Sequence, residues 1–576
     1  MPWSSCLWIN MNLKMFCDKK NVNILTAILP QIGITDVVVC PGSRNGVIVH
    51  NFNELSNASS HRDAFSDFRI HAVTDERSAA FVALGISLAE NLKPVAVCVT
   101  SGSALLNTLP AVAEAFYQHV PLLVISADRP KRLIGQLDGQ TIVQNSALMP
   151  YAKTYELPEP QNDTEEHWCR NLVSEACIEL KKQGRKPVHI NVPITEPMFT
   201  FTTEFLPLVK PIAFQEMFGE GIPGNLVEII NKANLPTLVI GQYDHKVNIL
   251  QELDNNNKLL ILPEIVSNQE KCYRTTVLEC SDELRSRLQP DVVIHVGDNM
   301  VNKKLKLAFR KRSNLSVIRI QKNAGLPDTF EHIDDLVLGD WERILIALSP
   351  YLHQNLKVQE MRCLLDNYNM VGKNRTNFIK EDKIVPTQIN GEKHDSENAD
   401  VQYTTMLAIK KYLQESHIPI NAIHLANSSV VRTATKVFCD GKFVLRVNRG
   451  VNGIEGSLSV AVGNALVCEQ YVLVFIGDLS FFYDQNALWN SELLGNLRIV
   501  LFNNSGGGIF KKLPGLDASP ACGPYISGAH QTSAKGIAEA YRMKYLCIYK
   551  TDKLEEVIAN YFGKQEERSV LLEIYC

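Results

Sequence analysis

Short runs of apolar residues, each ending at a turn of small, polar or charged residues, recur along this chain. In the first third of the sequence they occupy residues 37–40, 95–99 and 122–126, separated by stretches with helical spacing of apolar positions. Continuous apolar runs of this length are typical of parallel strands buried on both faces. The pattern predicts a parallel sheet that brings the polar residues after each run to one edge.

The same alternation continues in two further blocks. Predicted strands of the middle block are residues 237–240, 259–262, 292–296, 317–320 and 336–338, and those of the last block are 422–426, 443–446, 471–476, 499–502 and 570–574. Residues 371–400 are instead polar and charged, which indicates a linker or surface loop. We expect an α/β fold of three doubly wound parallel-sheet domains, at residues 21–200, 206–365 and 401–576.

The bulk composition excludes several classes of protein. A length of 576 residues with 45% hydrophobic residues and a net charge of -4 is typical of a multidomain globular protein and gives no reason to expect nucleic acid. The 14 cysteines form no Cys-x-x-Cys pair or Cys/His cluster, so we expect no disulfide framework, no zinc site and a cytoplasmic setting. The longest apolar stretches are too short, or too interrupted by charge, for membrane insertion.

The N-terminus is a poor signal peptide, because it lacks a continuous apolar core before a cleavage site. Met11 and Met15 offer later starts. We expect residues 1–20 to be a disordered or start-site extension.

The most informative chemistry lies near the C-terminus. One predicted strand ends at Gly477-Asp478, and the next ends at Asn503-Asn504 followed by a glycine-rich turn. A carboxylate, an Asn oxygen and a free backbone carbonyl are hard donors that suit a Mg²⁺ ion bound also to a diphosphate. The alternative is an ordinary strand end, as at Gly297-Asp298, which has no Asn pair behind it.

A second candidate group lies at residues 72–80. Asp75 is predicted to cap a helix from Glu76 to about Glu90. Glu76 would then present a carboxylate where a strand ends and a helix begins. The alternative is a first-turn acid that complements the helix dipole.

Spacing of Gly477-Asp478 and the Asn pair resembles the diphosphate-anchoring signature of thiamine diphosphate enzymes, although Leu479 stands where that superfamily usually has Gly. Six motifs occur together and in order: residues 41–44, 75–80, 100–102, 128–130, 448–456 and 504–510. Together they are similar to the MenD family, the 2-succinyl-5-enolpyruvyl-6-hydroxy-3-cyclohexene-1-carboxylate synthases of menaquinone biosynthesis. The resemblance implies a pyrimidine-binding domain at 21–200, a central domain at 206–365 and a diphosphate-binding domain at 401–576.

That resemblance also implies a transferase reaction, in which 2-oxoglutarate is decarboxylated and its succinyl unit adds 1,4 to isochorismate. The cofactors would be thiamine diphosphate and Mg²⁺ or Mn²⁺. The family further implies a homodimer or homotetramer with active sites at the dimer interface. There, Glu76 of one chain would reach the cofactor held by Asp478 and Asn504 of another.

Roles for individual residues follow from the same motifs. Catalytic roles fall to Glu76, which would hydrogen-bond the pyrimidine ring, and to Ser43, Arg44 and Arg449. Isochorismate would be held by Arg129, Gln140 and Lys303, the succinyl carboxylate by Ser428 and Arg432, and the apolar part of the pocket by Ile509 and Phe510. The cofactor would contact Ile454, Gly477, Asp478, Leu479, Ser480, Asn504 and Gly506, with the Asp478 carboxylate, the Asn504 side chain and the Gly506 carbonyl on the metal and Asn503 as a strand-end residue.

Five of these residues are cations at strand or loop ends, and Arg forks pair well with carboxylates. The alternative for each is a solvated charge or a surface salt bridge. Three departures from the family pattern occur: Gly139 before Gln140 where Asn is frequent, Glu455 in place of Asp, and Asn45 in place of a small Ser.

Three other functions are alternatives to this one. A carboligase of the acetolactate synthase type would use singly charged pyruvate, which the excess of cations disfavours. A non-catalytic thiamine diphosphate sensor is disfavoured because Glu76, Asp478 and Asn504 are all retained. A nicotinamide-dependent oxidoreductase is disfavoured because no Gly-x-Gly-x-x-Gly follows a predicted strand.

Overall fold

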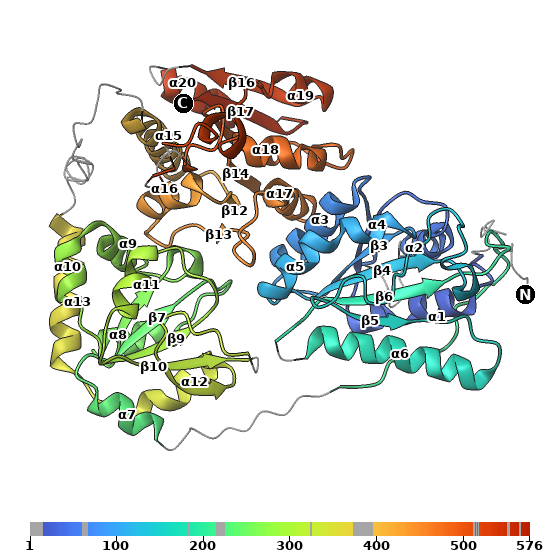
Figure 1. Cartoon of the computed structure of the whole chain (residues 1–576), viewed down its shortest axis with the longest axis horizontal. Helices are drawn as coiled ribbons and strands as arrows, with labels where there is room; N and C mark the ends of the chain where they lie inside the picture. Colours follow the sequence, from blue (N-terminus) through green and yellow to red (C-terminus); the bar gives the residue numbers. More distant parts are fainter. Residues whose placement is uncertain are drawn as a thin grey trace, which may run out of the picture. The chain divides into compact units, whose positions relative to one another are not determined.

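A computed structural model describes most of the chain. The described residues are 15–59, 67–182, 184–214, 225–322, 325–371, 395–510, 513, 515–516, 518–549, 553–563 and 566–576. The chain forms two compact units, Met1–Gln215 and Glu216–Cys576 (Figure 1).

Unit 1 contains a six-stranded parallel sheet in the order β2-β1-β3-β4-β6-β5. Its strands are β1 Asp36–Val39, β2 Arg69–Ala72, β3 Val95–Val99, β4 Leu122–Asp128, β5 Lys153–Glu156 and β6 Val188–Pro193. The three runs predicted here as strands are β1, β3 and β4. The strand order reverses between β1 and β3, which makes the loops after these two strands the expected ligand-binding edge.

Helices cover both faces of this sheet. They are α1 Lys20–Ile28, α2 Gly46–Ser59, α3 Glu76–Ala89, α4 Ser103–Asn107, α5 Leu109–Tyr117 and α6 Asp163–Lys181. α1, α2 and α6 share one apolar core with the sheet, while α3 packs on the other face with α5. The helix predicted to start at Glu76 is confirmed as α3, and the Asp75 carboxylate accepts hydrogen bonds from the backbone N–H groups of Arg77 and Ser78 at 2.9 and 3.2 Å.

Strand β6 was not predicted, because its alternating His189 and Asn191 give it the pattern of a half-exposed segment. Both side chains are buried. His189 Nε2 lies 2.7 Å from Ser126 Oγ, and its Nδ1 lies 3.1 Å from Thr154 Oγ1. Hydrogen bonds between neighbouring strands thus replace water around these polar groups, which makes an interior position tolerable.

The burial of His189 predicts acid sensitivity of unit 1. Burial lowers the pKa of His189 to about 3. The His189 side chain therefore stays unprotonated in the folded protein, whereas in the unfolded protein it takes up a proton below about pH 6.5. Stability must therefore fall as the pH drops through that window, by on the order of 2 kcal/mol between pH 7 and 5. Urea unfolding should show that the free energy of unfolding falls less between pH 7 and 5 in His189→Gln than in the wild type. Replacement of the exposed His167 by Gln should leave the pH dependence unchanged; an identical loss in all three proteins would contradict the assignment.

Unit 2 holds two parallel sheets. The central sheet has the order β11-β10-β9-β7-β8, with β7 Thr237–Ile240, β8 Leu260–Pro263, β9 Val292–Val296, β10 Ser316–Gln321 and β11 Ile333–Leu338. Its helices are α7 Leu226–Lys232, α8 Ile249–Asn255, α9 Tyr273–Cys280, α10 Asp282–Arg287, α11 Lys303–Arg310, α12 Trp341–Leu348 and α13 Leu356–Val371. α7, α8 and α12 pack on one face, and α9, α10, α11 and α13 on the other.

The C-terminal sheet of unit 2 has six parallel strands in the order β13-β12-β14-β15-β17-β16. They are β12 Ile420–Leu425, β13 Leu445–Arg446, β14 Tyr471–Gly477, β15 Leu497–Asn503, β16 Lys544–Ile548 and β17 Val570–Tyr575. Helices α15 Asp395–Glu415, α16 Ser429–Val437 and α20 Leu554–Phe562 share one core with the sheet, and α17 Ser457–Leu466, α18 Asp478–Asp484 and α19 Lys535–Ala540 complete the domain. The three-sheet α/β architecture predicted from the sequence is confirmed.

Two predicted boundaries differ from the structure. Residues 395–400, expected to end the linker, belong to α15. The rest of the expected linker from residue 372 lies outside the described residues. Residues 15–20, expected to be part of the N-terminal extension, join unit 1: Phe16 pairs with Thr203, and the buried Cys17 donates its backbone N–H to Asn51 Oδ1.

The structure describes no helix long and apolar enough to cross a membrane. Residues 1–14 of the expected extension lie outside the described part of the chain.

Candidate active site

The carboxyl edge of the C-terminal sheet carries the residues predicted to anchor the cofactor. The strand order reverses at β12, which pairs with β13 on one side and β14 on the other. Because all strands are parallel, the loops after β12, β14 and β15 open at the same edge. The structure thereby brings Ser428, Asp478 and Asn504 to one edge of the sheet.

Asp478 is the best-defined group at this edge. Its side chain is buried and accepts three backbone hydrogen bonds: from Leu479 at 2.7 Å, from Gly506 at 2.9 Å and from Asn504 at 3.1 Å. Burial raises the pKa of Asp478, and the Gly506 N–H is the first of the donors that oppose this shift. The carboxylate therefore joins the end of β14 to the turn that follows β15.

Three oxygen atoms, one of them from this carboxylate, converge at the sheet edge. The Asn504 side-chain oxygen lies 3.1 Å from Asp478 Oδ2 and 2.6 Å from the Gly506 carbonyl oxygen, with no donor among them. Such a cluster is relieved either by a cation between the oxygens or by rotating the amide so that its NH₂ group donates to both. Hard oxygen donors fit Mg²⁺ or Mn²⁺, so the residues present suit the predicted metal.

Backbone conformation makes this arrangement possible at Gly506. The residue has φ +145°, and a Cβ atom there would lie 2.9 Å from the Ser527 carbonyl oxygen. A side chain at this position would push the turn apart, so glycine is needed here for the Gly506 N–H to reach Asp478 and for the Gly506 carbonyl to lie beside the Asn504 side chain. Ile509 and Phe510 follow in the same turn and are half-buried.

Two residues not predicted from the sequence shape this edge. His530 Nε2 lies 3.2 Å from Asp478 Oδ2, while its Nδ1 accepts the Thr532 N–H at 3.1 Å, which indicates that Nε2 carries the proton. Glu573, fully buried in β17, accepts from the Asn503 amide at 2.7 Å and from the Tyr545 hydroxyl at 2.7 Å. Asn503, the last residue of β15, is thus held in the interior, as expected for a strand-end residue.

The loop after β12 carries the residues predicted to hold the succinyl carboxylate. Ser428 precedes α16 with φ +77°, and Arg432 lies on the first turn of that helix with an exposed side chain. Helix N-termini attract anions, so both residues occupy a place suited to a carboxylate.

Asn427, which was not predicted, ties this loop to its neighbour. Its amide donates to the carbonyl oxygens of Asn448 and Gly453 at 2.8 Å each, and its Oδ1 accepts from Arg449 at 3.3 Å. Ile454, predicted to contact the cofactor, is 41% exposed, and Glu455 beside it is half-buried.

Lys303 lies in the central domain, directly after a loop that contacts Arg449. It is exposed at the first position of α11. Within unit 2, the Asn299 amide donates to the Arg449 carbonyl oxygen, and the Arg449 guanidinium donates to the Met300 carbonyl oxygen at 3.5 Å. The loop before Lys303 therefore contacts Arg449.

In unit 1, Glu76 is the first residue of α3 and is half-buried. Because Asp75 makes the capping hydrogen bonds, the Glu76 carboxylate is not needed to begin the helix. It accepts instead from the Asn107 side chain of α4 at 3.2 Å. This position is compatible with the predicted catalytic role.

Ser43 and Arg44 follow β1 but have different surroundings. Ser43 is exposed, whereas Arg44 is buried and donates to the Ile194 carbonyl oxygen and to Glu196 at 3.3 and 3.2 Å. The preceding Gly42 brings this loop against the one after β3, since a Cβ atom there would lie 2.4 Å from Thr100 Cβ. In this structure Arg44 therefore pairs with protein groups.

Arg129 is held by the residue that departs from the family pattern. Its Nε donates to the Gly139 carbonyl oxygen at 3.0 Å, so the backbone at Gly139 supplies a polar contact where the family often has an Asn side chain. Gln140 is exposed. Gln144, not predicted, is buried and accepts the Gly102 N–H at 2.7 Å while donating to Asn191 at 2.7 Å, which links this segment to the loop after β3.

Two segments of this chain match models of known protein families. The family described as "Thiamine pyrophosphate enzyme, N-terminal TPP binding domain" matches residues 20–148, and "Thiamine pyrophosphate enzyme, C-terminal TPP binding domain" matches residues 429–574. The chain is similar to 2-succinyl-5-enolpyruvyl-6-hydroxy-3-cyclohexene-1-carboxylate synthases. That of Bacteroides thetaiotaomicron is 36% identical, covering 97% of this chain and 96% of the relative. That of Desulfotalea psychrophila is 33% identical, covering 89% and 90%.

The chain belongs to the 2-succinyl-5-enolpyruvyl-6-hydroxy-3-cyclohexene-1-carboxylate synthase family. As a member of this synthase family it is a thiamine diphosphate-dependent enzyme. The benzoylformate decarboxylase of Polynucleobacter necessarius is similar in structure, with a TM-score of 0.66 and 15% identity over 97% of this chain and 99% of that one, which shows a shared fold.

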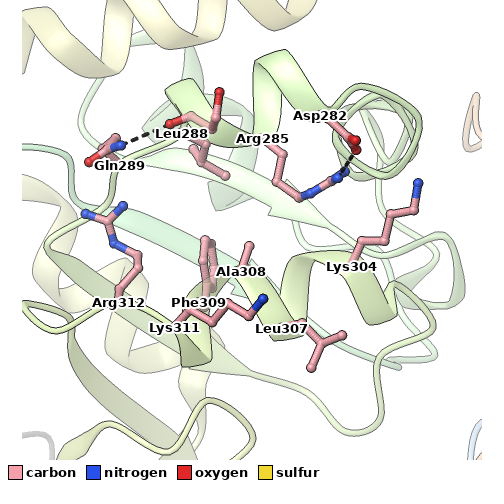
Figure 2. A pocket seen from close by; sticks show the side chains of 11 residues that line it. Asp282, Arg285, Leu288, Gln289, Lys304, Leu307, Ala308, Phe309, Lys311 and Arg312 are labelled. Carbon is pink, nitrogen blue, oxygen red and sulfur yellow. Dashed lines mark hydrogen bonds and ion pairs between the residues drawn. The ribbon is translucent and has the colours of Figure 1, made fainter.

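The central domain contains a pocket that is lined by other residues than those predicted for the site. Figure 2 shows this hollow of about 490 Å³ between α10 and α11 in the central domain. Lys304, Lys311 and Arg312 line it together with the apolar Leu307 and Phe309, and Arg285 is paired with Asp282. None of the predicted site residues lines it, although Lys304 directly follows Lys303.

Proposed function

We propose that this enzyme decarboxylates 2-oxoglutarate and adds the succinyl unit to isochorismate, giving 2-succinyl-5-enolpyruvyl-6-hydroxy-3-cyclohexene-1-carboxylate in menaquinone biosynthesis. The observation that carries the proposal is the oxygen cluster of Asp478, Asn504 and Gly506 at the sheet edge of a chain related to this synthase family over nearly its full length. Mg²⁺ or Mn²⁺ would be held by these three oxygens, and the diphosphate would lie beside the N-terminus of α18.

Some of the predicted residues would contact the cofactor, and others would bind the substrates. Thiamine diphosphate, when bound, supplies the carbon nucleophile and the electron sink for decarboxylation. Glu76 would hold a proton at the pyrimidine ring, and Ile454 would contact the cofactor with an apolar side chain. Ser428 and Arg432 would bind the succinyl carboxylate at the start of α16, because a cation and a helix N-terminus act there on the same anion.

The acceptor substrate would be bound by several of the predicted cations. Arg129, Gln140 and Lys303 would hold the carboxylates of isochorismate, with Ser43, Arg44 and Arg449 beside the reacting groups and Ile509 and Phe510 against its apolar face. We propose a homodimer or homotetramer, in which Glu76 of one chain serves the cofactor bound at Asp478 of another. The free cysteines of the described chain, many of them buried, suit a reducing cytoplasm.

The proposed substrates can be tested with two variants of α16. The wild type, supplied with thiamine diphosphate and Mg²⁺, should consume 2-oxoglutarate and isochorismate together and leave pyruvate untouched. Arg432→Gln should raise the KM for 2-oxoglutarate by about 10- to 100-fold, since it removes a charge-assisted hydrogen bond to a carboxylate. Progress can be followed by the loss of isochorismate and by mass spectrometry of the product.

Lys436, one turn further along the same helix, provides the control, because it is also an exposed cation. Lys436→Gln should leave both KM values unchanged. Consumption of pyruvate with 2-oxoglutarate ignored would refute the proposed reaction in favour of a carboligase of the acetolactate synthase type.

A further inference from the structure

One loop of the central domain connects two residues of the proposed acceptor site. Residues 297–302 join β9 to α11, and Lys303 is the first residue after them. Asn299 and Met300 in this loop hydrogen-bond to the Arg449 carbonyl oxygen and guanidinium. The positions of Lys303 and Arg449 relative to one another therefore depend on how this loop is held.

Glu264, at the end of β8, holds the loop through its carboxylate. It is 2% exposed, and its Oε2 and Oε1 accept the consecutive backbone N–H groups of Val301 and Asn302 at 3.3 and 3.1 Å. The Asn302 side chain in turn caps α11 by accepting the Leu305 N–H at 2.9 Å. Both oxygens of Glu264 are thus used on the two residues before Lys303.

The chain that follows Glu264 enters the C-terminal domain. Ile265 and Val266 are buried in the core that includes α15, α16 and β12. Asn268 exchanges two hydrogen bonds with the Leu445 backbone of β13, at 2.8 and 3.2 Å. Because β13 leads directly to Arg449, Glu264 lies between the two segments that carry the acceptor-site cations.

Burial and hydrogen bonding act on the charge of Glu264 in opposite directions. Burial raises the pKa of Glu264 to about 7, and Glu279 of α9 adds to the shift, whereas the two N–H donors and Lys306 of α11 oppose it. Since this folded pKa lies above the ordinary value of 4.5, ionisation lowers stability as the pH rises from 4.5 through 7. The carboxylate therefore does not serve stability at neutral pH, and a role in placing the loop explains why it is there.

We propose that Glu264 is a positioning residue, whose carboxylate fixes the loop 297–302 and thereby sets Lys303 and Arg449 for binding the acceptor substrate. The inference rests on the proposed function, because that function makes Lys303 and Arg449 part of the acceptor site. Protonation removes one acceptor oxygen, so the loop loosens as the pH falls below 7.

Glu264→Gln tests this role in the full-length holoenzyme. The Gln oxygen can accept only one of the two N–H groups, and its NH₂ group faces the other. We expect the KM for isochorismate to rise about tenfold, the equivalent of one lost hydrogen bond, while the KM for 2-oxoglutarate changes less than about twofold. The fall in kcat/KM for isochorismate below pH 7 should flatten, and hydrogen exchange at Val301 and Asn302 should accelerate.

Asp291 supplies a matched control in the same domain. Its carboxylate also accepts two consecutive backbone N–H groups, from Asn234 and Leu235 at 2.6 and 2.8 Å, but it precedes β9 at the opposite edge of the sheet. Asp291→Asn should accelerate exchange only near residues 234–235 and leave both KM values unchanged. Glu264→Asp, which keeps the charge but is too short to reach both donors, should repeat the effect of Gln and covers the case in which the Gln variant does not fold.

Faster exchange at Val301 and Asn302 with an unchanged KM for isochorismate would overturn the positioning role, and so would unchanged exchange. The exchange measurement does not depend on the substrate. If the wild type fails to use isochorismate while Glu264→Gln still loosens the loop, the proposed function is wrong and the structural contact stands.

Discussion

Replacement of Glu76 by Gln is expected to lower kcat by about 10²- to 10⁴-fold, the usual contribution of a positioned acid–base group. The carboxylate is lost, but the shape of the side chain and its contact with Asn107 are kept. Asp75 makes both capping hydrogen bonds of α3, so the helix should form as in the wild type. Thiamine diphosphate affinity, measured by calorimetry, should stay within a few-fold of the wild type.

Glu90 at the other end of α3 is the matched control. It pairs with Arg69 and Lys93 at 2.6 and 3.2 Å, far along the helix from Glu76. Glu90→Gln should leave kcat unchanged. Full turnover by Glu76→Gln would refute the catalytic role of Glu76. Its only role would then be that of a first-turn acid that complements the helix dipole.

Asp478→Asn is expected to remove metal-dependent cofactor binding. An amide offers one acceptor oxygen where three N–H groups now converge, so its NH₂ group would face the donors of Asn504 or Gly506. We expect the Mg²⁺-dependent affinity for thiamine diphosphate to fall by at least about 100-fold. The free energy of unfolding of the apoenzyme should fall by about 1–3 kcal/mol because a buried donor loses its partner. Calorimetry with and without Mg²⁺ measures the first effect, and urea unfolding the second.

Asp340, which caps α12 through the N–H groups of Glu342 and Arg343, controls for the loss of a carboxylate at a helix start in the same unit. Asp340→Asn should leave cofactor affinity unchanged, since Asn is also a good N-cap. Equal cofactor affinity in Asp478→Asn and the wild type would contradict the metal site.

The two catalytic variants also test the proposed assembly. In a homodimer whose sites combine Glu76 of one chain with Asp478 of the other, each mixed dimer has one intact site. Mixing Glu76→Gln with Asp478→Asn should therefore restore about a quarter of wild-type activity after random exchange of subunits. No recovery from subunits shown to exchange would mean that both residues serve the cofactor from the same chain.

Most strands could be predicted because apolar runs in a parallel sheet are contiguous in sequence. β1 and β4 are buried along their length, and β14 is buried except at its two ends. All three end in polar turns, so their pattern can be recognised from adjacent residues alone. Sequence reasoning failed where strands carry polar residues. In β6, His189 and Asn191 are buried because they hydrogen-bond to other strands. The edge strands β5 and β16 are partly exposed and contain lysines.

The candidate site shows the same division. Asp478, Asn504 and Gly506 could be predicted to lie together because they belong to a short motif that follows two predicted strands. The partners that hold them were not: His530 and Glu573 approach the edge from distant segments and carry no periodic signal. The roles assigned to the substrate-binding cations remain predictions, and the pairing of Arg44 with Glu196 could not be read from spacing.

By itself, the sequence determined the α/β class, the family and the cofactor, because these depend on local hydrophobic pattern and on motifs of adjacent residues. Only the tertiary structure decided which buried polar groups support them. Glu264 and Glu573 each hold backbone or side-chain groups far away in sequence, and their environments follow from burial among strands rather than from neighbouring residues. A polar side chain in the interior is stable only where folding supplies its hydrogen-bond partners, and those partners are defined in space.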